Sequence, residues 1–268
     1  MYNKHVKIEI IGIRGENMVK SYINKYEVNY HDVDYNLQCK LPSILNFLCD
    51  IGSRQSASLG DTIERLKEKG YAWIFYKYDI KMHKYPKYLD EIYIKTIPCG
   101  FKKFYAHRRY ELTNAEGELL GEAVALFFLV NIDKRRPMRI PEEEYNLYGL
   151  DTSENEDIKM EEILKIDEDE NSFKKKFNVR YSDIDSNGHV NNVNYVEWAI
   201  ESVPLEVVKS FDIERIKVIF EKESIYGDEV NVSATLIKEG DNITSIHTIK
   251  NQEEKELTKL EILWKKQK

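Results

Sequence analysis

The chain carries the same short motif twice. Residues 30–36 read YHDVDYN and residues 181–187 read YSDIDSN, so both fit the pattern Y-x-D-[V/I]-D-x-N, 151 residues apart. A second pair of matching segments follows in the same order, because DEIYI at 90–94 resembles DEVNV at 228–232. Repetition of this kind predicts two copies of one structural unit within the chain.

The separation between matching segments shrinks along the chain. It falls from 151 residues at the first pair to 138 at the second, and a third pair, the turn-like NAEG at 114–117 and NQEE at 251–254, keeps 137. The first copy therefore carries about a dozen extra residues, which we expect within Ser53–Gly70. We expect an N-terminal domain at 1–150, an acidic linker at 151–170 and a C-terminal domain at 171–268.

Each copy contains one long helical pattern. Apolar residues recur at every third or fourth position, as on one face of a helix, at two places: Leu41, Leu45, Leu48 and Ile51, and Val193, Val196, Ile200 and Val203. Downstream, residues 230–236 and 260–264 alternate between apolar and polar, the pattern of an antiparallel sheet with one face on a core. One helix per sheet predicts an α+β fold in which an antiparallel sheet wraps around a central helix. Two such units in one chain are expected to pack as a pseudo-dimer.

Composition narrows the partners and the compartment. The formal net charge is −7, which argues against a general affinity for nucleic acid. Cys39, Cys49 and Cys99 are widely spaced and form no zinc-ligand pattern, so we expect reduced thiols in the cytoplasm. We expect no signal peptide and no membrane insertion, because no apolar run approaches the length of a membrane-spanning helix. No metal or organic cofactor is implied.

Polar residues gather just before the second helical pattern. Asp185, Asn187 and His189 lie within five positions of one another, and Gly188 permits a tight turn between them. Asn191 or the residue after it is suited to cap the helix, whose N-terminus favours a developing oxyanion. An aspartate or histidine beside that end is suited to act as a base, a nucleophile or an orienting group.

Each of these residues also has a purely structural interpretation. Asp185 and Asn187 suit an Asx turn that leads into the helix, and His189 suits a buried, hydrogen-bonded histidine. Comparison of the two copies favours function, because His189 matches Gln38, which cannot act as an acid or base near neutral pH. The repeat therefore predicts one working site per chain, in the second copy.

The run YSDIDSNGHVNNVNYVEW at 181–198 resembles the signature D-x-N-x-H-V-N-N-x-x-Y of the acyl-acyl-carrier-protein thioesterases of plants and bacteria. The resemblance covers most of the chain and implies two tandem hotdog domains. It also implies a catalytic set of Asp185, Asn187, His189 and a glutamate 34 residues after the histidine, which is Glu223 here. Ser224 stands where many relatives have cysteine, which argues against a thiol nucleophile. Gly188 and the lack of a visible transit peptide suit a bacterial-type member.

The resemblance implies hydrolysis of fatty acyl-acyl-carrier-protein to free fatty acid and carrier protein. Either Glu223 or Asp185 would activate water, and Asp185 acts as the nucleophile or base in an alternative scheme that resembles the 4-hydroxybenzoyl-CoA thioesterases. An acyl-CoA thioesterase and a non-catalytic acyl-thioester sensor are the alternative functions. The acyl chain is expected in a pocket of the N-terminal domain, and the protein is expected to be a monomer or a homodimer.

The implied partner, acyl carrier protein, is acidic, so local basic runs are its expected contacts. The sequence offers three such runs: Lys102, Lys103, Arg108 and Arg109; Lys134, Arg135, Arg136 and Arg139; and Lys174, Lys175 and Lys176.

Overall fold

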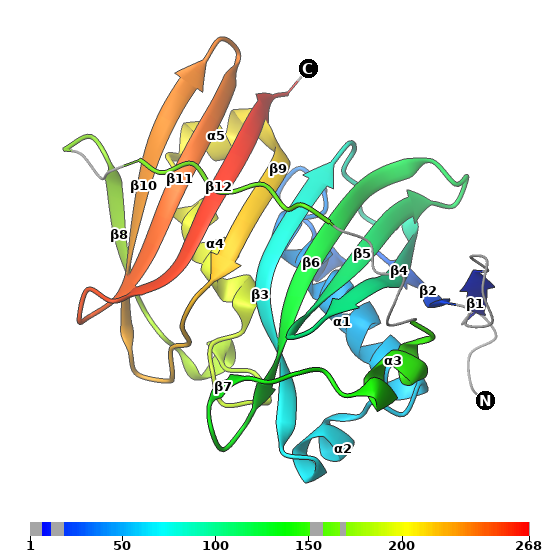
Figure 1. The fold of residues 1–268 in the computed structure, drawn as a ribbon. Coiled ribbons are helices and arrows are strands. Elements are labelled where there is room, and N and C mark those ends of the chain that lie inside the picture. Colours follow the sequence, from blue (N-terminus) through cyan, green and yellow to red (C-terminus); the bar gives the residue numbers. More distant parts are fainter. Residues whose placement is uncertain (1–6, 12–18, 151–157, 167–169, 268) are drawn as a thin grey trace. The chain divides into compact units, whose positions relative to one another are not determined.

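A computed structural model describes residues 7–11, 19–150, 158–166 and 170–267 of the chain. Contacts divide the chain into two compact units: residues 1–76 with 83–160, and residues 77–82 with 161–268. Each unit is an antiparallel sheet with one principal helix (Figure 1).

The first unit contains the strands β1, β2 and β4 to β7, residues 71–76 of β3, and the helices α1 to α3. The sheet has the order β1-β2-β4-β5-β6-β3, with the short β7 paired to β6. The elements are β1 Lys7–Ile11, β2 Val19–Glu27, a 3-10 turn at Tyr30–Asp32, α1 Leu41–Ser58, α2 Ile63–Glu68, β3 Tyr71–Met82, β4 Glu91–Lys102, β5 Tyr105–Asn114, β6 Leu119–Asn131, β7 Arg136–Pro137 and α3 Glu142–Tyr148.

The second unit repeats this plan with fewer residues. Its sheet has the order β9-β12-β11-β10-β8, and residues 77–81 of β3 pair with β9. The elements are β8 Phe173–Asn178, a 3-10 turn at Tyr181–Asp183, α4 Asn192–Glu201, α5 Leu205–Ser210, β9 Phe211–Phe220, β10 Glu229–Glu239, β11 Asn242–Asn251 and β12 Glu256–Lys266.

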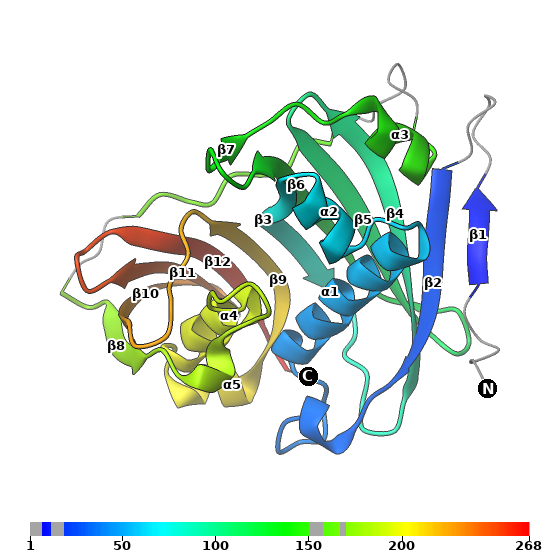
Figure 2. The ribbon, with the colours of Figure 1, turned by 90° about the horizontal axis from the view of Figure 1, so that it is seen from below.

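The two principal helices lie against the concave faces of their sheets (Figure 2). In α1 the buried face comprises Leu41, Ile44, Leu45, Leu48 and Ile51, as the periodicity predicted. In α4 the buried face comprises Val193, Tyr195, Val196, Trp198 and Ala199, whereas the expected Ile200 is only half-buried and the expected Val203 lies beyond the end of the helix. The expected α+β fold, a sheet around a central helix in each copy, is confirmed.

Hydrogen bonds show that the two copies share their turns. Asn114 Oδ1 accepts from the backbone N–H groups two and four residues later, at 3.1 and 2.8 Å. Asn251 Oδ1 does the same at 3.0 and 2.9 Å.

The two copies differ in length between the principal helix and the next strand. From the start of the principal helix to the next strand there are 30 residues in the first copy and 19 in the second. The difference of 11 residues falls in the expected segment, where α1 has 18 residues against 10 in α4, and α2 occupies the place that α5 has in the second copy.

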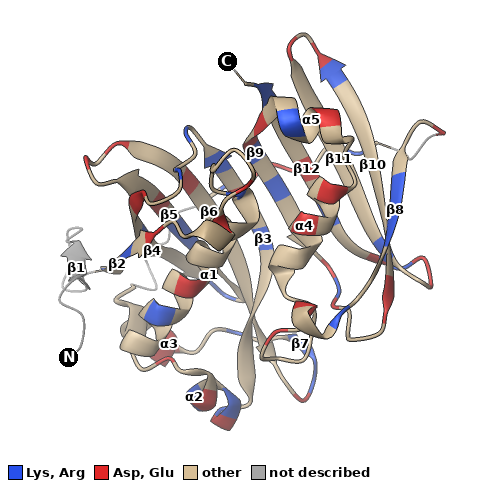
Figure 3. Cartoon of the chain, turned by 180° about the vertical axis from the view of Figure 1, so that it is seen from behind, with Lys and Arg blue, Asp and Glu red and all other residues tan. Residues whose placement is uncertain are grey.

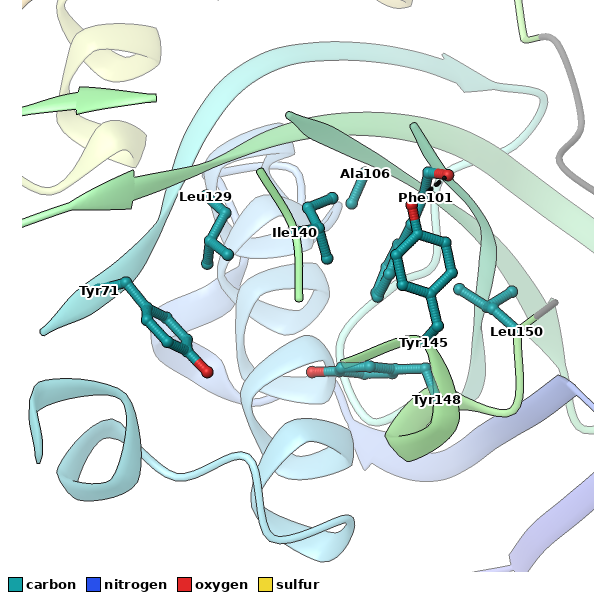
Figure 4. Packing of buried hydrophobic residues seen from close by; sticks show 8 residues of the cluster. All are labelled: Tyr71, Phe101, Ala106, Leu129, Ile140, Tyr145, Tyr148 and Leu150. Carbon is teal, nitrogen blue, oxygen red and sulfur yellow. Dashed lines mark hydrogen bonds between the residues drawn. The ribbon is translucent and has the colours of Figure 1, made fainter. Parts of the chain in front are cut away.

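Aromatic side chains dominate one hydrophobic cluster of the first unit (Figure 4). The Tyr145 hydroxyl donates to the Phe101 carbonyl at 3.2 Å, which fastens α3 to the end of β4. Tyr71 and Tyr148 turn their hydroxyl groups toward one another in Figure 4, and each donates to a buried carboxylate, Glu144 at 2.8 Å and Asp61 at 2.7 Å.

Arg65 bridges these two carboxylates, at 2.7 Å from Asp61 and 2.8 Å from Glu144. Both carboxyl groups are fully buried, so the guanidinium supplies the countercharge that such groups require. This network fixes the short helices α2 and α3 to the core of the first unit.

A segment of the expected linker crosses the second sheet on the side away from α4 (Figure 1). Ile163 is buried there, and Lys217 of β9 donates to the Glu162 carbonyl at 3.0 Å. Lys217 also pairs with Glu261 of β12 at 2.7 Å, and Glu261 accepts the Leu164 N–H at 2.8 Å. Residues 151–157 and 167–169 of the expected linker lie outside the described residues.

Among the described residues, no helix is long and apolar enough to cross a membrane.

Candidate active site

The turn before α4 is built on the Asp185 carboxylate. Asp185 Oδ1 accepts the Asn187 N–H at 2.7 Å, and Asp185 N–H donates to the His189 carbonyl at 2.8 Å. In the first copy, Asp34 makes the matching bonds, at 2.8 Å to Asn36 N–H and 2.8 Å to the Gln38 carbonyl. The Asx turn weighed in the sequence analysis is therefore present in both copies, and it presents His189 in one and Gln38 in the other.

One position in this turn requires a left-handed backbone. Gly188 adopts φ +82°, and the matching Leu37 adopts φ +59°. A side chain is strained in that region, whereas glycine adopts it readily. The copy that carries His189 therefore has the more relaxed turn.

Asp183 anchors the turn to the protein, a role that the sequence analysis missed. Its carboxylate is buried and paired with the Arg180 guanidinium at 2.6 Å. Its backbone carbonyl accepts the Asn191 N–H at 2.8 Å and the Asn194 side-chain amide at 3.0 Å. The repeated motif held the signal, because Asp32 occupies the same place and accepts the Asn29 N–H at 2.9 Å.

A second segment, after β9, meets the turn. Val190 N–H donates to the Ser224 carbonyl at 2.9 Å, and Ser224 N–H donates to the Tyr195 hydroxyl oxygen at 3.0 Å. Burial raises the pKa of Tyr195, so its phenol stays neutral as it accepts this bond. Tyr195 thus ties the segment that carries Glu223 to the helix that follows His189.

The four expected site residues form two pairs. His189 Nε2 lies 3.4 Å from Glu223 Oε2, and both side chains are partly open to solvent. Asn187 Nδ2 lies 3.5 Å from Asp185 Oδ2. Among the described contacts, no side-chain hydrogen bond or ion pair joins one pair to the other, although the backbone bond from Asp185 N–H to the His189 carbonyl does. Gln38 and Tyr85 occupy the positions of His189 and Glu223 in the first copy.

The start of α4 offers fewer free N–H groups than the sequence suggested. Asn191 is the helix cap and its side chain accepts the Val193 N–H at 3.1 Å. The Asn194 N–H donates to the Asn191 carbonyl at 2.9 Å. Of the N–H groups at the described start of the helix, that of Asn192 has no recorded acceptor, which makes it the candidate donor to an oxyanion.

The expected basic runs differ in exposure. Arg108 is buried under α1, where it donates to Gln55 and, at 3.0 Å, to Thr96, so its assignment to a surface run was wrong. The cause is strand alternation, which turns Arg108 inward and its exposed neighbour Arg109 outward. The second run is exposed in the loop around β7.

The third run lies on β8, the edge strand of the second sheet (Figure 3). Lys175 and Lys176 pair there with Glu201 and Glu229, at 3.7 and 2.8 Å. Lysines on an edge strand hinder edge-to-edge aggregation, which explains this run without a partner.

Lys102, Lys103 and Arg139 line an open groove of about 840 Å³ in the first unit. Glu142 and apolar side chains, among them Phe101, Ile140 and Tyr145, complete its wall.

A sheet around a central helix, present twice in one chain, defines a tandem hotdog protein. The comparisons with known proteins agree. The family model described as the acyl-ACP thioesterase N-terminal domain matches residues 19–148, and that of the C-terminal domain matches residues 166–266. The chain belongs to the acyl-ACP thioesterase family.

Relatives in plants are distant. The chloroplastic oleoyl-acyl carrier protein thioesterase of Coriandrum sativum is 25% identical over 226 residues, which cover 79% of this chain and 61% of that protein. A palmitoyl-acyl carrier protein thioesterase of Gossypium hirsutum is 24% identical over 214 residues, 75% of this chain and 52% of that protein. The chain spans about three fifths of the length of the first of these relatives.

Solved structures share the fold. A putative oleoyl thioesterase from Lactobacillus plantarum superposes with a TM-score of 0.89 at 21% identity, covering 93% of this chain and 98% of that one. The 12:0-ACP thioesterase from Umbellularia californica superposes with a TM-score of 0.82 at 18% identity, covering 92% of this chain and 94% of that one.

Proposed function

We propose that this protein hydrolyses fatty acyl-acyl-carrier-protein to free fatty acid and carrier protein. The observation that carries the proposal is the contact between His189 and Glu223 beside the ordered turn of Asp185. An imidazole and a carboxylate in contact, both partly open to solvent, can activate water and move a proton. Membership of the acyl-ACP thioesterase family supplies the thioester as substrate.

In the proposed reaction, Glu223 takes a proton from a water molecule as the water oxygen attacks the thioester carbonyl carbon. The carbonyl oxygen gains negative charge, which the Asn192 N–H stabilises. Collapse of this intermediate breaks the C–S bond. The proton held by Glu223 passes through His189 to the departing sulfur, so the products are a fatty acid and a thiol.

Asp185 and Asn187 have a supporting role in this proposal. The Asp185 carboxylate accepts the Asn187 N–H and thereby sets the turn that presents His189. The same bond forms at Asp34, in the copy without the histidine, so it serves the turn in both copies. Glu223 is therefore our choice of base, since it is the carboxylate in contact with His189.

The domain assignment is part of the proposal. The C-terminal domain, 171–268, would be catalytic, and the N-terminal domain, 1–150, would lack the acid–base pair because it has Gln38 and Tyr85 at those positions. The acyl-chain pocket in the N-terminal domain stays a prediction, as does the choice between monomer and homodimer.

The proposed carrier is an acidic protein rather than CoA. The groove lined by Lys102, Lys103 and Arg139 and the exposed run at 134–136 support this choice, because they place positive charge on a chain of net charge −7.

We also propose the cytoplasm as the compartment. Burial raises the pKa of Cys39 to about 12, which keeps this free thiol protonated and unreactive.

The test is hydrolysis of one acyl chain presented on carrier protein and on CoA, repeated over several chain lengths. We expect turnover that favours the carrier protein and falls at least 100-fold in His189→Ala, the range of a lost acid–base group. The matched control is Gln38→Ala in the first copy, which should keep its turnover. Tight binding of both thioesters with no turnover would instead indicate a sensor.

A further inference from the structure

Two exposed tyrosines flank the contact between His189 and Glu223. Tyr181 begins the 3-10 turn that leads to His189, and Tyr226 follows Glu223 by three residues. Their exposed fractions are 86% and 68%. Gly227 N–H donates to the Val179 carbonyl at 3.3 Å, so the two segments adjoin. An exposed aromatic patch beside a polar site is a common mark of a binding surface.

The first copy provides an internal comparison. By the same repeat, Tyr30 matches Tyr181 and Tyr88 matches Tyr226, and Leu89 N–H donates to the Val28 carbonyl at 2.9 Å. The rings of Tyr30 and Tyr88 pack edge to face, with centroids 6.2 Å apart. Their pairing is the arrangement that two aromatic rings prefer.

The second copy leaves its pair open. Within the described part of the chain, neither the Tyr181 nor the Tyr226 side chain has a ring contact or a hydrogen bond to another residue. The pair is therefore closed in the copy that has Gln38 and open in the copy that has His189. The open pair therefore leaves ring faces available to a partner from outside the chain.

We propose that Tyr181 and Tyr226 bind the pantetheine arm of the thioester substrate. This inference rests on the proposed function, and it names the part of the substrate that the site binds in addition to the acyl chain. A pantetheine arm is a slender chain of secondary amides and methylene groups without charge. Flat amides stack on aromatic rings, methylene groups pack against their faces, and the phenol hydroxyl groups can hydrogen-bond to the amides.

Tyr181 and Tyr226 would act as positioning residues. They lie on the two segments that carry His189 and Glu223, which the bond from Val190 N–H to the Ser224 carbonyl joins at 2.9 Å. An arm held between these segments brings its terminal thioester to the acid–base pair. The arm is the same in carrier protein and in CoA, so its contacts should serve both substrates equally.

The experiment compares one acyl chain on four thiols: carrier protein, CoA, pantetheine and ethanethiol, the last of which lacks the arm. Tyr181→Ala and Tyr226→Ala should each raise KM about fivefold for the three substrates with an arm, since one aromatic contact contributes about 1 kcal/mol. Neither should change kcat more than about twofold. KM for the ethanethiol ester should not change, and Tyr181→Phe should retain most of the affinity.

Tyr30→Ala and Tyr88→Ala are the matched controls, because they remove the rings at the same two positions from the copy with the closed pair. Losses of the same size in these controls, or with ethanethiol ester, would overturn the inference. A loss confined to carrier protein would also overturn it, because the rings would then contact the protein and not its arm.

A binding measurement separates this inference from the proposed function. A thioether analogue of acyl-pantetheine cannot be hydrolysed, and its Kd should rise about fivefold in each tyrosine variant. Wild-type protein that binds this analogue through the two rings but hydrolyses nothing would contradict the proposed function and support the inference. Hydrolysis by the wild type with unchanged KM and Kd in both variants would overturn the inference alone.

Discussion

At the residue scale, His189 and Gln38 occupy one position of a shared turn. The backbone bonds around them match, including the 2.8 Å bond from the aspartate N–H to the histidine or glutamine carbonyl. The chemical difference between the copies therefore lies in the side chains placed on a common backbone. Our proposal assigns the acid–base chemistry to the copy in which His189 also meets Glu223.

Substitution of the two carboxylates tests which of them is the base. Glu223→Gln should lower kcat at least 100-fold, because an amide cannot take the proton from water. Asp185→Asn should lower it less, because an amide oxygen still accepts the Asn187 N–H and preserves the turn. Steady-state kinetics on one acyl-carrier-protein substrate measures the loss of kcat in both variants. A larger loss in Asp185→Asn than in Glu223→Gln would make Asp185 the base.

A buried histidine makes stability depend on pH. His247 of β11 is fully buried, with Nε2 2.8 Å from Ser245 Oγ, and burial lowers its pKa to about 3. The unfolded chain binds a proton at this residue near pH 6.5, whereas the folded protein does not, so stability falls as pH drops from 6.5 toward 3. Between pH 6.5 and 5 the loss should be about 2 kcal/mol.

Urea unfolding at pH 7, 6 and 5 measures this loss. The slope of stability against pH should shrink by about one proton in His247→Gln, which removes the histidine whose pKa burial lowers in the folded protein. Equal slopes in the wild type and His247→Gln would contradict the assignment.

The sequence named His189 from a local motif and Glu223 from the spacing that the family resemblance implies, and the structure places the two side chains in contact, while their catalytic roles stay a prediction. It was insufficient for Tyr195, whose bond to Ser224 joins residues 29 positions apart. The sequence alone also did not predict the open ring pair. Tyr181 and Tyr226 are far apart along the chain, and they come near the site only when the segment after β9 meets the turn. Contacts that depend on folding leave no local pattern to detect.

At the scale of elements, the helices were the most predictable part. The buried face of α1 follows the apolar spacing along one stripe, which is a local property of the sequence. In α4 only Val193 and Val196 of the four expected residues belong to the buried face of the helix. Arg108 shows the limit of such reasoning. It belongs to a run of cations along the chain, but the strand turns it into the core, so charge in sequence did not predict charge on the surface.

The segment held across the second sheet depends on a buried ion pair. The Lys217 and Glu261 side chains are 9% and 13% exposed, and their charges lie 2.7 Å apart. Lys217→Met should lower the free energy of unfolding by about 3 kcal/mol, because it leaves the Glu261 carboxylate without its partner. Chemical denaturation measures this change.

The double variant Lys217→Met with Glu261→Met is the control. Removal of both charges avoids an unpaired buried carboxylate, so it should recover most of the lost stability. A double variant no more stable than Lys217→Met would contradict this role for the pair.

At the scale of the whole molecule, charge is unevenly distributed. The chain has a net charge of −7, yet Lys134, Arg135 and Arg136 are all exposed in one loop. An acidic carrier protein would be repelled by the total charge and attracted by this loop. Local cations of this kind act mainly on the rate of encounter.

Neutralising the loop tests that function. Replacement of Lys134, Arg135 and Arg136 by glutamine should lower kcat/KM for acyl-carrier-protein about fivefold at low salt, and by less at 0.5 M salt, because screening weakens the attraction. The kcat/KM for uncharged acyl-pantetheine should not change. The control replaces Lys174, Lys175 and Lys176 on β8, which should leave both substrates unaffected. Equal losses for the two substrates would exclude a role in carrier encounter.

Two copies in one chain have a genetic consequence. In an assembly of two identical subunits, every mutation appears at both equivalent positions, so a mutation that improves one and harms the other is lost. In a single chain that encodes both copies, a mutation changes only one of them. Gln38 and Tyr85 could replace an acid–base pair in one copy while His189 and Glu223 persisted in the other. The same freedom is open to the engineer, who can randomise one half of this chain while the other half is held constant.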